Sequence, residues 1–329
     1  MRVSQLPITL EDVRASAQRL KGVAVRTPVL QVDGPQRAPA RQLFIKCENL
    51  QRAGAFKFRG AYNRLAQLTE AERAAGIVAF SSGNHAQGVA LAARLLNIAA
   101  TIVMPADASR MKLEETKAFG ADVVLYDRAT QSREAIAASL ARERGGATLV
   151  PPYDDYLVMA GQGTAALELV EAIPDLDALL VPVGGGGLLA GTAVAAKGVR
   201  PDLRIYGVEP AGANDWALSW AAAEPVSVDA PETIADGLRT TSPGELTWPI
   251  VRALAEGILT VSDGEIRHAM RFLLERVKVV AEPSGAVGVA AALSSKLSVH
   301  ASKIGIIISG GNVDLDRLCA LLSDNENVL

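Results

Sequence analysis

The sequence predicts an α/β protein built on parallel sheets, and two observations carry this prediction. Short apolar segments alternate with segments of helical periodicity along most of the 329 residues. Hydrophobic residues make up 49% of the chain but aromatic residues only 4%, so the apolar mass is mainly Ala, Leu, Val and Ile. Such a composition is typical of helices packed on buried parallel strands. The length suits two domains or one large α/β body.

The first half of the chain shows the alternation most clearly. We expect a helix over residues 10–20, with Thr9 as its N-cap and with Glu11 and Asp12 at the positive end of the helix dipole. A loop rich in Pro, Gly and Ala follows at residues 31–41. Strands are then predicted at residues 77–80, 100–104, 123–126 and 148–150, with helices between them at 85–96, 111–119 and 133–142. This order implies right-handed crossovers and a parallel sheet.

The second half of the chain repeats the pattern. Strands are predicted at residues 178–183, 204–209 and 304–309, with a helix that follows a glycine run and ends near Lys197. No linker or repeat separates the halves, so the domain boundaries are drawn from the motifs. We expect a large domain formed by residues 1–67 and 155–329, with a smaller α/β domain at residues 68–154 inserted into it.

Charge and cysteine content exclude several classes of function. The net charge is −3 and charged residues are scattered, so no basic patch for nucleic acid or a lipid surface is evident. The cysteines, Cys47 and Cys319, are too few for a disulfide framework. No apolar run is long enough for a signal peptide or a membrane span. The reducing cytoplasm is therefore the expected location.

The most informative segment is residues 46–61, which surrounds Lys57. This lysine stands between Phe56 and Phe58, just before a predicted helix. Aromatic neighbours desolvate an amine, and the neutral form that this favours can attack an aldehyde. Taken alone, such a segment is more often an ordinary surface lysine at a helix start, so the interpretation of Lys57 needs support from other motifs.

A glycine run provides the first support. Four consecutive glycines, Gly184, Gly185, Gly186 and Gly187, lie between a predicted strand and a predicted helix. Consecutive glycines let backbone N–H groups converge on an anion, and a helix N-terminus favours negative charge. The run therefore predicts a phosphate-binding loop.

A rival interpretation of the same run is a dinucleotide-binding fingerprint. Gly185, Gly187 and Ala190 fit the pattern GxGxxA, and Glu209 ends the next strand about 20 residues on. This alternative leaves Lys57 and the next loop without a role.

That next loop, residues 80–88, also follows a predicted strand and opens a helix. Backbone N–H groups and short polar side chains in such a position suit a carboxylate. Its polar residues are Ser81, Ser82, Asn84 and His85. His85 alone would be a weak signal, because a lone histidine is more often structural.

Together these motifs resemble one enzyme family. The string ENLQRAGAFKFRGA around Lys57 is similar to the cofactor-lysine motif of the serine/threonine dehydratase and serine racemase family, which are fold-type-II pyridoxal-phosphate enzymes. The likeness runs over nearly the whole chain, in the family's motif order, and is strongest to serine racemase. It implies a two-domain fold like that of the tryptophan synthase β subunit, with parallel-sheet three-layer domains. Pyridoxal 5'-phosphate would bind where the two domains meet.

The resemblance also implies roles for individual residues. Lys57 would hold the cofactor as a Schiff base and later act as base at Cα, with Phe56 packed by the ring. The four glycines would bind the phosphate, and Asn84 would reach the ring oxygen. Ser309 would face the pyridine nitrogen, where a hydroxyl leaves the ring a moderate electron sink. The implied substrate-binding residues are Ser81, Ser82, Asn84, His85 and Arg133.

Ser82 bears on which reaction is catalysed. Racemisation requires an acid/base group on each face of Cα, and Lys57 serves only one face. Ser82 resembles the residue that serine racemases place opposite the lysine, where simple threonine dehydratases usually have Ala. Ser82 therefore permits racemisation without proving it.

A metal site is implied after the strand that ends at Glu209. Two carboxylates and a carbonyl can form an oxygen shell for Mg²⁺, Ca²⁺ or Mn²⁺. Serine racemases carry such a site, and the matching ligands are Glu209, the carbonyl of Ala213, and Asp215. Two acids so close in sequence are more usually a solvated surface. The metal would be structural, because the chemistry belongs to the cofactor.

The substrate signals are mixed. Residues 151–155 resemble a turn of catabolic threonine dehydratases, whereas Arg133 matches an arginine that serine racemases bring toward the substrate. Arg133 could pair with a second carboxylate, as in 3-hydroxyaspartate, or could be a solvated helix residue. The expected function is therefore β-elimination of serine, threonine or 3-hydroxyaspartate to a 2-keto acid and ammonia, with serine racemase as the alternative. A homodimer is the family's habit.

Overall fold

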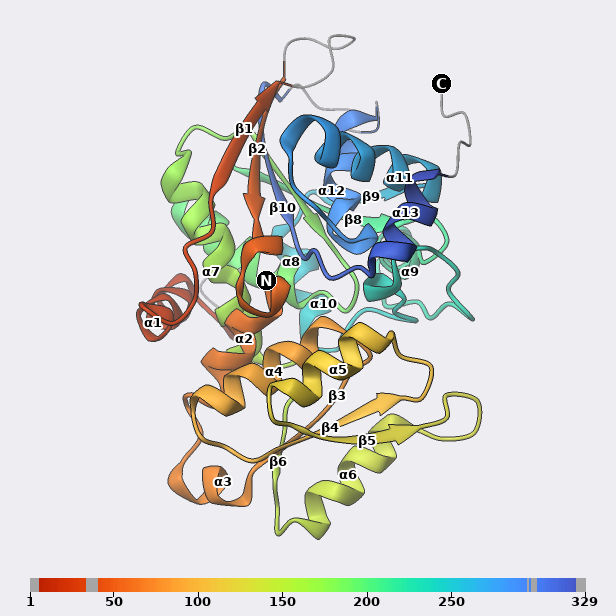
Figure 1. Ribbon diagram of the computed structural model, residues 1–329. Coiled ribbons are helices and arrows are strands. Elements are labelled where there is room, and N and C mark those ends of the chain that lie inside the picture. The colour runs from red at the N-terminus through yellow and green to blue at the C-terminus, as the bar shows by residue number, and fades with distance from the viewer. Residues whose placement is uncertain (1–5, 34–40, 295, 297–300, 324–329) are drawn as a thin grey trace.

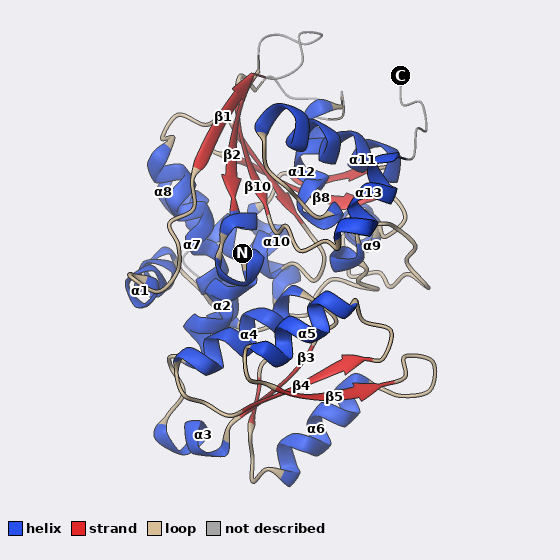
Figure 2. Ribbon diagram, viewed as in Figure 1, coloured by secondary structure: helices blue, strands red, loops and turns tan. Residues whose placement is uncertain are grey.

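The computed structural model describes residues 6–33, 41–294, 296 and 301–323, and these residues form two sheets (Figures 1 and 2). The six-stranded sheet has the order β1-β2-β10-β7-β8-β9, and the four-stranded sheet has the order β5-β4-β3-β6. The strands of the larger sheet are β1 (Val29–Asp33), β2 (Gln42–Cys47), β7 (Ala178–Pro182), β8 (Arg204–Pro210), β9 (Gly257–Val261) and β10 (Lys303–Ile308). Those of the smaller sheet are β3 (Ile77–Phe80), β4 (Ala100–Pro105), β5 (Asp122–Tyr126) and β6 (Thr148–Leu149).

The strand pairs are parallel, as predicted, except at one edge. There β1 pairs antiparallel with β2, which follows it directly in the chain and needs no crossover helix. The expected loop at residues 31–41 was therefore wrong at its start, because residues 31–33 continue β1; residues 34–40 lie outside the described residues. The short sequence VLQVD, partly exposed at an edge, lacks the apolar run that marked the inner strands.

The helices that cover the sheets begin and end close to the predicted positions where a prediction was made. They are α1 (Leu10–Leu20), α2 (Lys57–Leu65), α3 (Glu70–Ala75), α4 (Asn84–Leu95), α5 (Arg110–Ala118), α6 (Arg133–Glu143), α7 (Tyr156–Ala172), α8 (Gly187–Val199), α9 (Asp215–Ala222), α10 (Thr247–Leu254), α11 (Asp263–Phe272), α12 (Pro283–Leu293) and α13 (Leu315–Ser323). Thr9 caps α1 as predicted, in a capping box completed by Asp12. Within the described residues, every helix is too short or too polar to span a lipid bilayer.

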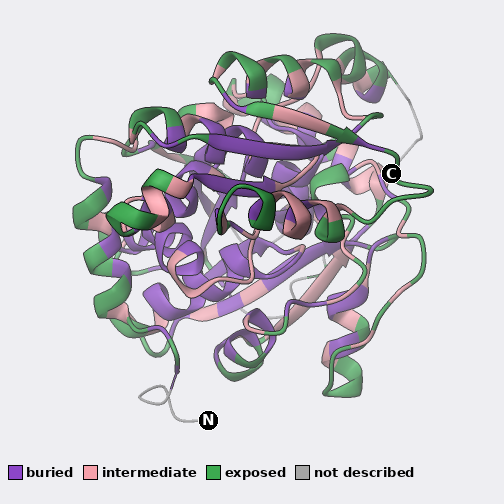
Figure 3. Cartoon of the chain, turned by 90° about the horizontal axis from the view of Figure 1, so that it is seen from below, coloured by how far each residue is buried: buried purple, intermediate pink, exposed green. Residues whose placement is uncertain are grey.

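Each sheet is the middle of three layers. Along β7, Leu179 and Val181 face the core shared with α7 and α8, whereas Leu180 faces the core shared with α11 and α12. In the smaller sheet, alternate residues likewise face α4 on one side and α6 on the other. Such alternation follows from the two-residue period of a strand buried on both faces. Figure 3 shows the buried residues inside and the exposed ones along the outer helices.

The strands of the smaller sheet all come from residues 77–149, inside the segment predicted as an inserted domain. Between the two sheets lies α2, which contacts α4 on one side and α7 on the other (Figure 1). Its first residue, Lys57, therefore stands where the two halves of the molecule meet. The domain boundaries at residues 67/68 and 154/155 stay a prediction.

Candidate active site

Lys57 begins α2 next to the end of β10. The backbone N–H of Phe56 donates to the Ser309 carbonyl at 3.0 Å, and Ala55 forms a β-bridge with Gly310. These backbone contacts bring together segments that are about 250 residues apart in the sequence, and so they close a long loop of the chain. The predicted cofactor lysine and the predicted pyridine-facing serine are therefore neighbours.

The Lys57 amine has an apolar environment without an anion. Nζ lies 5.2 Å from the centroid of the Phe56 ring and donates to the Pro152 carbonyl at 2.6 Å. Within the described residues it forms no ion pair. Burial lowers the pKa of this amine to about 8, because no carboxylate stabilises its charged form. A large share of the amine is therefore neutral, and hence nucleophilic, slightly above neutral pH.

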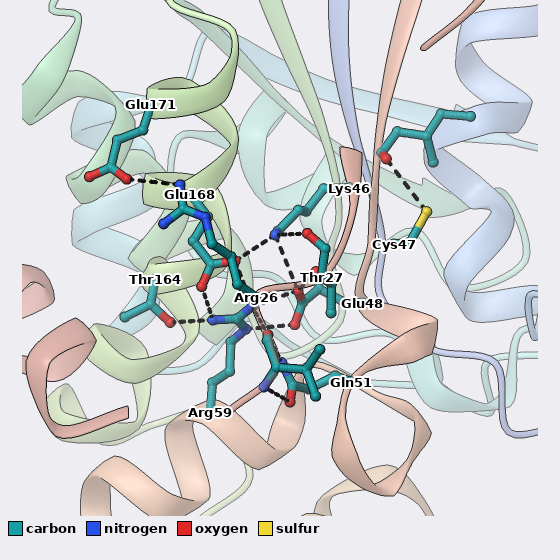
Figure 4. A network of polar contacts seen from close by, with 12 residues as sticks. Arg26, Thr27, Lys46, Cys47, Glu48, Gln51, Arg59, Thr164, Glu168 and Glu171 are labelled. Atoms are coloured by element: carbon teal, nitrogen blue, oxygen red, sulfur yellow. Dashed lines mark hydrogen bonds and ion pairs between the residues drawn. The ribbon is translucent and has the colours of Figure 1, made fainter. Parts of the chain in front are cut away.

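A buried ionic cluster supports the first turn of α2 (Figure 4). The Arg59 guanidinium donates to both oxygens of Glu48, at 2.7 and 2.8 Å, and to both oxygens of Glu168 in α7, at 2.8 and 3.0 Å. Lys46 in β2 completes the cluster by donating to Glu168 and to the Thr27 carbonyl. We call these four charged residues the paired cluster. Its two cations and two carboxylates balance.

The predicted phosphate loop lies between β7 and α8, as expected. Gly186 has φ +95°, a left-handed conformation that other residues adopt only with strain. A Cβ on Gly185 would overlap the Tyr153 ring. Trp216 Nε1 donates to the Gly184 carbonyl and Thr247 Oγ1 to the Gly185 carbonyl. In a trans peptide the C=O and the following N–H point in opposite directions. The N–H groups of Gly185 and Gly186 therefore face away from Trp216 and Thr247 and are available to an anion.

The predicted carboxylate loop lies between β3 and α4, and its histidine is fully buried. His85 Nε2 lies 3.0 Å from the Val150 carbonyl, so Nε2 carries the hydrogen, and Nδ1 has no partner within the described residues. Burial, reinforced by the Lys57 charge, lowers the pKa of His85 to about 3. The neutral imidazole can accept at Nδ1 but cannot donate there. A carboxylate in this loop would therefore be bound by backbone N–H groups rather than by the imidazole.

Asn84, the first residue of α4, connects the two halves of the molecule. Its side-chain Nδ2 donates to Glu282 Oε1, and its side-chain Oδ1 accepts from Asn312 Nδ2 at 3.0 Å. Burial raises the pKa of Glu282 to about 7. Glu282 and Asn312 were not among the site residues predicted from the sequence. Only Pro283, a helix-start signal, marked the position of Glu282, and nothing local showed that it would meet Asn84.

The remaining predicted site residues surround these loops. Ser309 is buried directly after β10 and its hydroxyl lies 3.4 Å from the Ser284 carbonyl, a weak bond that leaves it free for a better partner. Ser82 is partly buried in the turn before α4 and has no side-chain hydrogen bond within the described residues. Arg133 begins α6, with its guanidinium 5.3 Å from the Phe80 ring centroid. Because Phe80 precedes Ser81, Arg133 lies beside the carboxylate loop, while its Nε bonds Glu134 at 2.7 Å.

The predicted metal ligands lie near the end of β8, in the turn that follows it and at the first residue of α9, and they are not a solvated surface. The side chains of Glu209 and Asp215 are fully buried. Burial raises the pKa of Glu209 to about 8 and that of Asp215 to about 7, and no ion pair forms at either carboxylate within the described chain. Glu209 accepts from the N–H groups of Trp216 and Ala217, at 3.2 and 2.7 Å. Buried acids without a cation fit a divalent metal ion.

The described residues hold no group of three or more His, Cys, Asp or Glu side chains that could bind a metal. A metal at Glu209 and Asp215 would therefore need backbone carbonyls, such as that of Ala213, or water to complete its coordination. We call Glu209 and Asp215 the unpaired cluster.

The site as a whole offers what an aldehyde-bearing phosphate ester requires. It combines an amine without an anion, a glycine loop with available amides at a helix start, and a buried hydroxyl directly after β10, the strand that pairs with β7. These groups fit pyridoxal phosphate.

Comparisons with known proteins agree with this geometry. A family model for pyridoxal-phosphate dependent enzymes matches residues 20–310. An L-threo-3-hydroxyaspartate ammonia-lyase from a Pseudomonas species is 52% identical over 94% of this chain and 97% of that protein. A serine racemase from Schizosaccharomyces pombe is 48% identical over 96% of this chain and 97% of that protein. The solved structure of maize serine racemase matches with a TM-score of 0.89 and 42% identity, covering 95% of this chain and 96% of that one.

These matches confirm the predicted fold and set aside the dinucleotide-binding alternative for the glycine run. The matched segment contains Lys57, both loops and Ser309. The chain belongs to the family of pyridoxal-phosphate dependent enzymes.

Proposed function

We propose that this protein removes water and then ammonia from a small hydroxy-amino acid, yielding a 2-keto acid. The observation that carries the proposal is the Lys57 amine: it is half-buried beside Phe56, is bonded within the described residues only to a neutral carbonyl, and has a pKa lowered to about 8. Relatives over nearly the whole chain are named ammonia-lyases or serine racemases, which supports the same chemistry.

Each part of the site has a proposed task. Bound pyridoxal phosphate supplies the aldehyde that captures the substrate amine and the ring that takes up the electrons released at Cα. Lys57 holds the cofactor and then removes the Cα proton. The amides of residues 184–187 bind the phosphate, and the Ser309 hydroxyl faces the pyridine nitrogen. Asn84 faces the ring oxygen, and Ser81, Ser82 and the backbone N–H of His85 form the carboxylate site.

For the substrate we propose 3-hydroxyaspartate ahead of serine and threonine. Arg133 lies over Phe80, next to the carboxylate loop, and its side chain is 39% exposed. It already pairs with Glu134, which a substrate carboxylate would have to displace or share. A guanidinium in this place can hold a second carboxylate that serine and threonine lack. The ammonia-lyase relative named for L-threo-3-hydroxyaspartate supports this choice.

A coupled keto-acid assay over L-threo-3-hydroxyaspartate, L-serine, D-serine and L-threonine tests the proposal. Wild-type enzyme should bind pyridoxal phosphate with a visible absorbance that borohydride removes, and Lys57→Ala should lose both that absorbance and the activity. Arg133→Met should raise KM for 3-hydroxyaspartate by about tenfold or more relative to serine. The matched control is Arg128→Met, whose ion pair with Asp107 is exposed. Equal effects of Arg133→Met on both substrates would rule out the second-carboxylate role.

Serine racemisation is the second candidate, and Ser82 is the observation in its favour. Its hydroxyl is partly buried in the carboxylate loop without a side-chain partner among the described residues, so it is available to a substrate. Ser82→Ala should suppress conversion of L-serine to D-serine more than formation of keto acid, as measured by chiral chromatography. Equal loss of both would refute this role.

We also propose a structural divalent cation, Mg²⁺ first, at Glu209, Asp215 and the Ala213 carbonyl. Both carboxylates are buried and neither forms an ion pair with the described part of the chain, which supports this site. A homodimer, a cytoplasmic location and a domain division at residues 68 and 154 complete the proposal; gel filtration with light scattering tests the dimer.

A further inference from the structure

We propose that Asp154 is a positioning residue for Lys57. It fixes the segment 150–155 so that the Pro152 carbonyl accepts a hydrogen bond from the lysine amine whenever that amine is not bonded to the cofactor. The inference rests on the proposed role of Lys57 and extends it to the stages in which the amine is free.

The segment 150–155 joins β6 of the smaller sheet to α7 of the larger half. Two of its carbonyls accept hydrogen bonds from side-chain nitrogens of the site: Val150 from the buried His85 Nε2 at 3.0 Å, and Pro152 from Lys57 Nζ at 2.6 Å. The carboxylate loop, through His85, and Lys57 are thus both hydrogen-bonded to the same stretch of backbone.

The chemistry explains why a neutral acceptor suits this place. A lysine that exchanges the cofactor with a substrate amine must be released and must return in every turnover. A released amine on a flexible stem needs a partner, or it samples many rotamers. A carboxylate partner would hold it protonated, whereas a carbonyl orients the N–H and leaves the amine able to lose or take a proton. Pro152 provides such an acceptor.

Asp154 anchors the segment to the large half. Its carboxylate accepts from the backbone N–H groups of Glu245, Leu246 and Thr247 at 3.1, 2.9 and 3.2 Å, at the start of α10. These N–H groups have no partner within a helix, which makes the contact an N-cap in character. Asp154 lies two residues after Pro152, so loss of the cap frees the carbonyl to move.

The same anchor is shared with the phosphate loop. Thr247 donates its hydroxyl to the Gly185 carbonyl at 2.7 Å, and the Tyr153 ring covers Gly185. The start of α10 therefore fixes both the phosphate loop and the acceptor of Lys57. An experiment must separate these two effects.

Pyridoxal, which lacks the phosphate, is the probe that separates them. In the apoenzyme the Lys57 amine attacks the aldehyde carbon, water leaves, and the resulting C=N bond is followed by its visible absorbance. Because pyridoxal makes no phosphate contact, its rate reports on the amine alone. Asp154→Ala should slow this reaction by about tenfold or more, since small displacements of a reacting group are costly. With substrate, the same variant should lower kcat much more than it changes KM.

Matched variants decide between positioning and general weakening of the fold. Ser262→Ala removes the N-cap of α11, where Ser262 Oγ accepts from Glu265 N at 3.2 Å. It should lower the melting temperature about as much as Asp154→Ala without changing the pyridoxal rate. Asp154→Asn keeps an acceptor oxygen at the cap and should restore most of the rate. Gly244→Ala retains the Asp154 residue, but its Cβ would lie 2.5 Å from Asp154 Oδ1 and so would displace the carboxylate. It should therefore reproduce the loss if Asp154→Ala does not fold.

The outcomes are distinguishable. An Asp154→Ala rate with pyridoxal equal to that of Ser262→Ala overturns the inference, as does a defect seen with pyridoxal phosphate only, which would assign Asp154 to the phosphate loop. Failure of Asp154→Asn to restore the rate would also overturn it, because the negative charge and not the anchor would then matter. If wild-type apoenzyme formed no imine at all, the proposed function itself would fail.

Discussion

The large half of the molecule contains two clusters with buried carboxylates, and they differ in whether positively charged side chains accompany those carboxylates. In the paired cluster, Glu48 faces Arg59 and Lys46; burial alone would raise the pKa of Glu48, but the nearby Arg59 charge and its hydrogen bonds outweigh burial and lower it. In the unpaired cluster, burial raises the pKa of Glu209 to about 8, because only backbone N–H groups offset it. Equal burial thus gives opposite shifts, and the partners decide the sign.

This difference suggests different roles for the two clusters: the paired cluster is a structural support, whereas the unpaired cluster is a candidate binding site. The paired cluster satisfies its own charges and supports the helix that begins with Lys57. The unpaired cluster lacks a positive charge within the described chain, and it lies next to the phosphate loop. Trp216, whose N–H donates to Glu209, also donates its indole N–H to the Gly184 carbonyl. A cation at the unpaired cluster would therefore act on the cofactor site through Trp216.

Breaking the paired cluster should have the largest effect. Arg59→Met leaves Glu48 and Glu168 facing each other without their main partner, and we expect a loss of about 3–5 kcal/mol in the free energy of unfolding. Urea unfolding of the apoenzyme, followed by far-UV circular dichroism, measures it. Arg64→Met, at the other end of α2, removes a half-buried pair with Asp155 and should cost only about 1 kcal/mol. Equal losses for the two variants would show that the cluster is not a special support.

Completing the unpaired cluster should have the next largest effect. Mg²⁺ at about 100 times its dissociation constant should add roughly 2.7 kcal/mol to the free energy of unfolding, because it binds only the folded chain. Thermal unfolding of chelator-treated enzyme, with and without Mg²⁺, measures the gain. Asp215→Asn should abolish it, whereas Asp175→Asn, which affects an exposed pair with Lys303, should not. A melting temperature that ignores Mg²⁺ would leave the metal without support.

The sequence predicted the elements around the site because each carries a local signal. The strand at residues 77–80 is β3, and the helix after it begins at Asn84, within one residue of the prediction. The glycine run and Lys57 also lie at helix starts, as their neighbours indicated. In contrast, α7 was missed: it is covered by α2 and α8, and an all-round apolar helix has no polar face to reveal its period.

The contacts that complete the site could not be read from local sequence. Glu168 joins Arg59 across 109 residues, Asp154 caps α10 from 93 residues away, and Glu282 reaches Asn84 across 198. A carboxylate looks the same in the sequence whether it becomes paired, unpaired or solvated. The resemblance to a family proposed Glu209 and Asp215 as metal ligands. Their burial, which is the physical reason to expect a cation there, is seen only in the fold.

The pH dependence of stability gives the smallest and most specific test of the comparison. The pKa of Glu48 is lower in the folded chain than in the unfolded one, where it is about 4.3. Its contribution to stability is therefore present above about pH 4.3 and is lost as the pH falls further, through the lower folded pKa. Urea unfolding at several pH values from about 5.5 downward should show this loss.

Glu48→Gln should flatten the slope below about pH 4.3 even though the variant is less stable overall, because no proton can then bind at this site. Glu11→Gln, which affects an exposed pair with Arg14, should keep the wild-type slope. An unchanged slope in Glu48→Gln would mean that the paired cluster does not hold this carboxylate ionised, and the contrast between the two clusters would lose its basis.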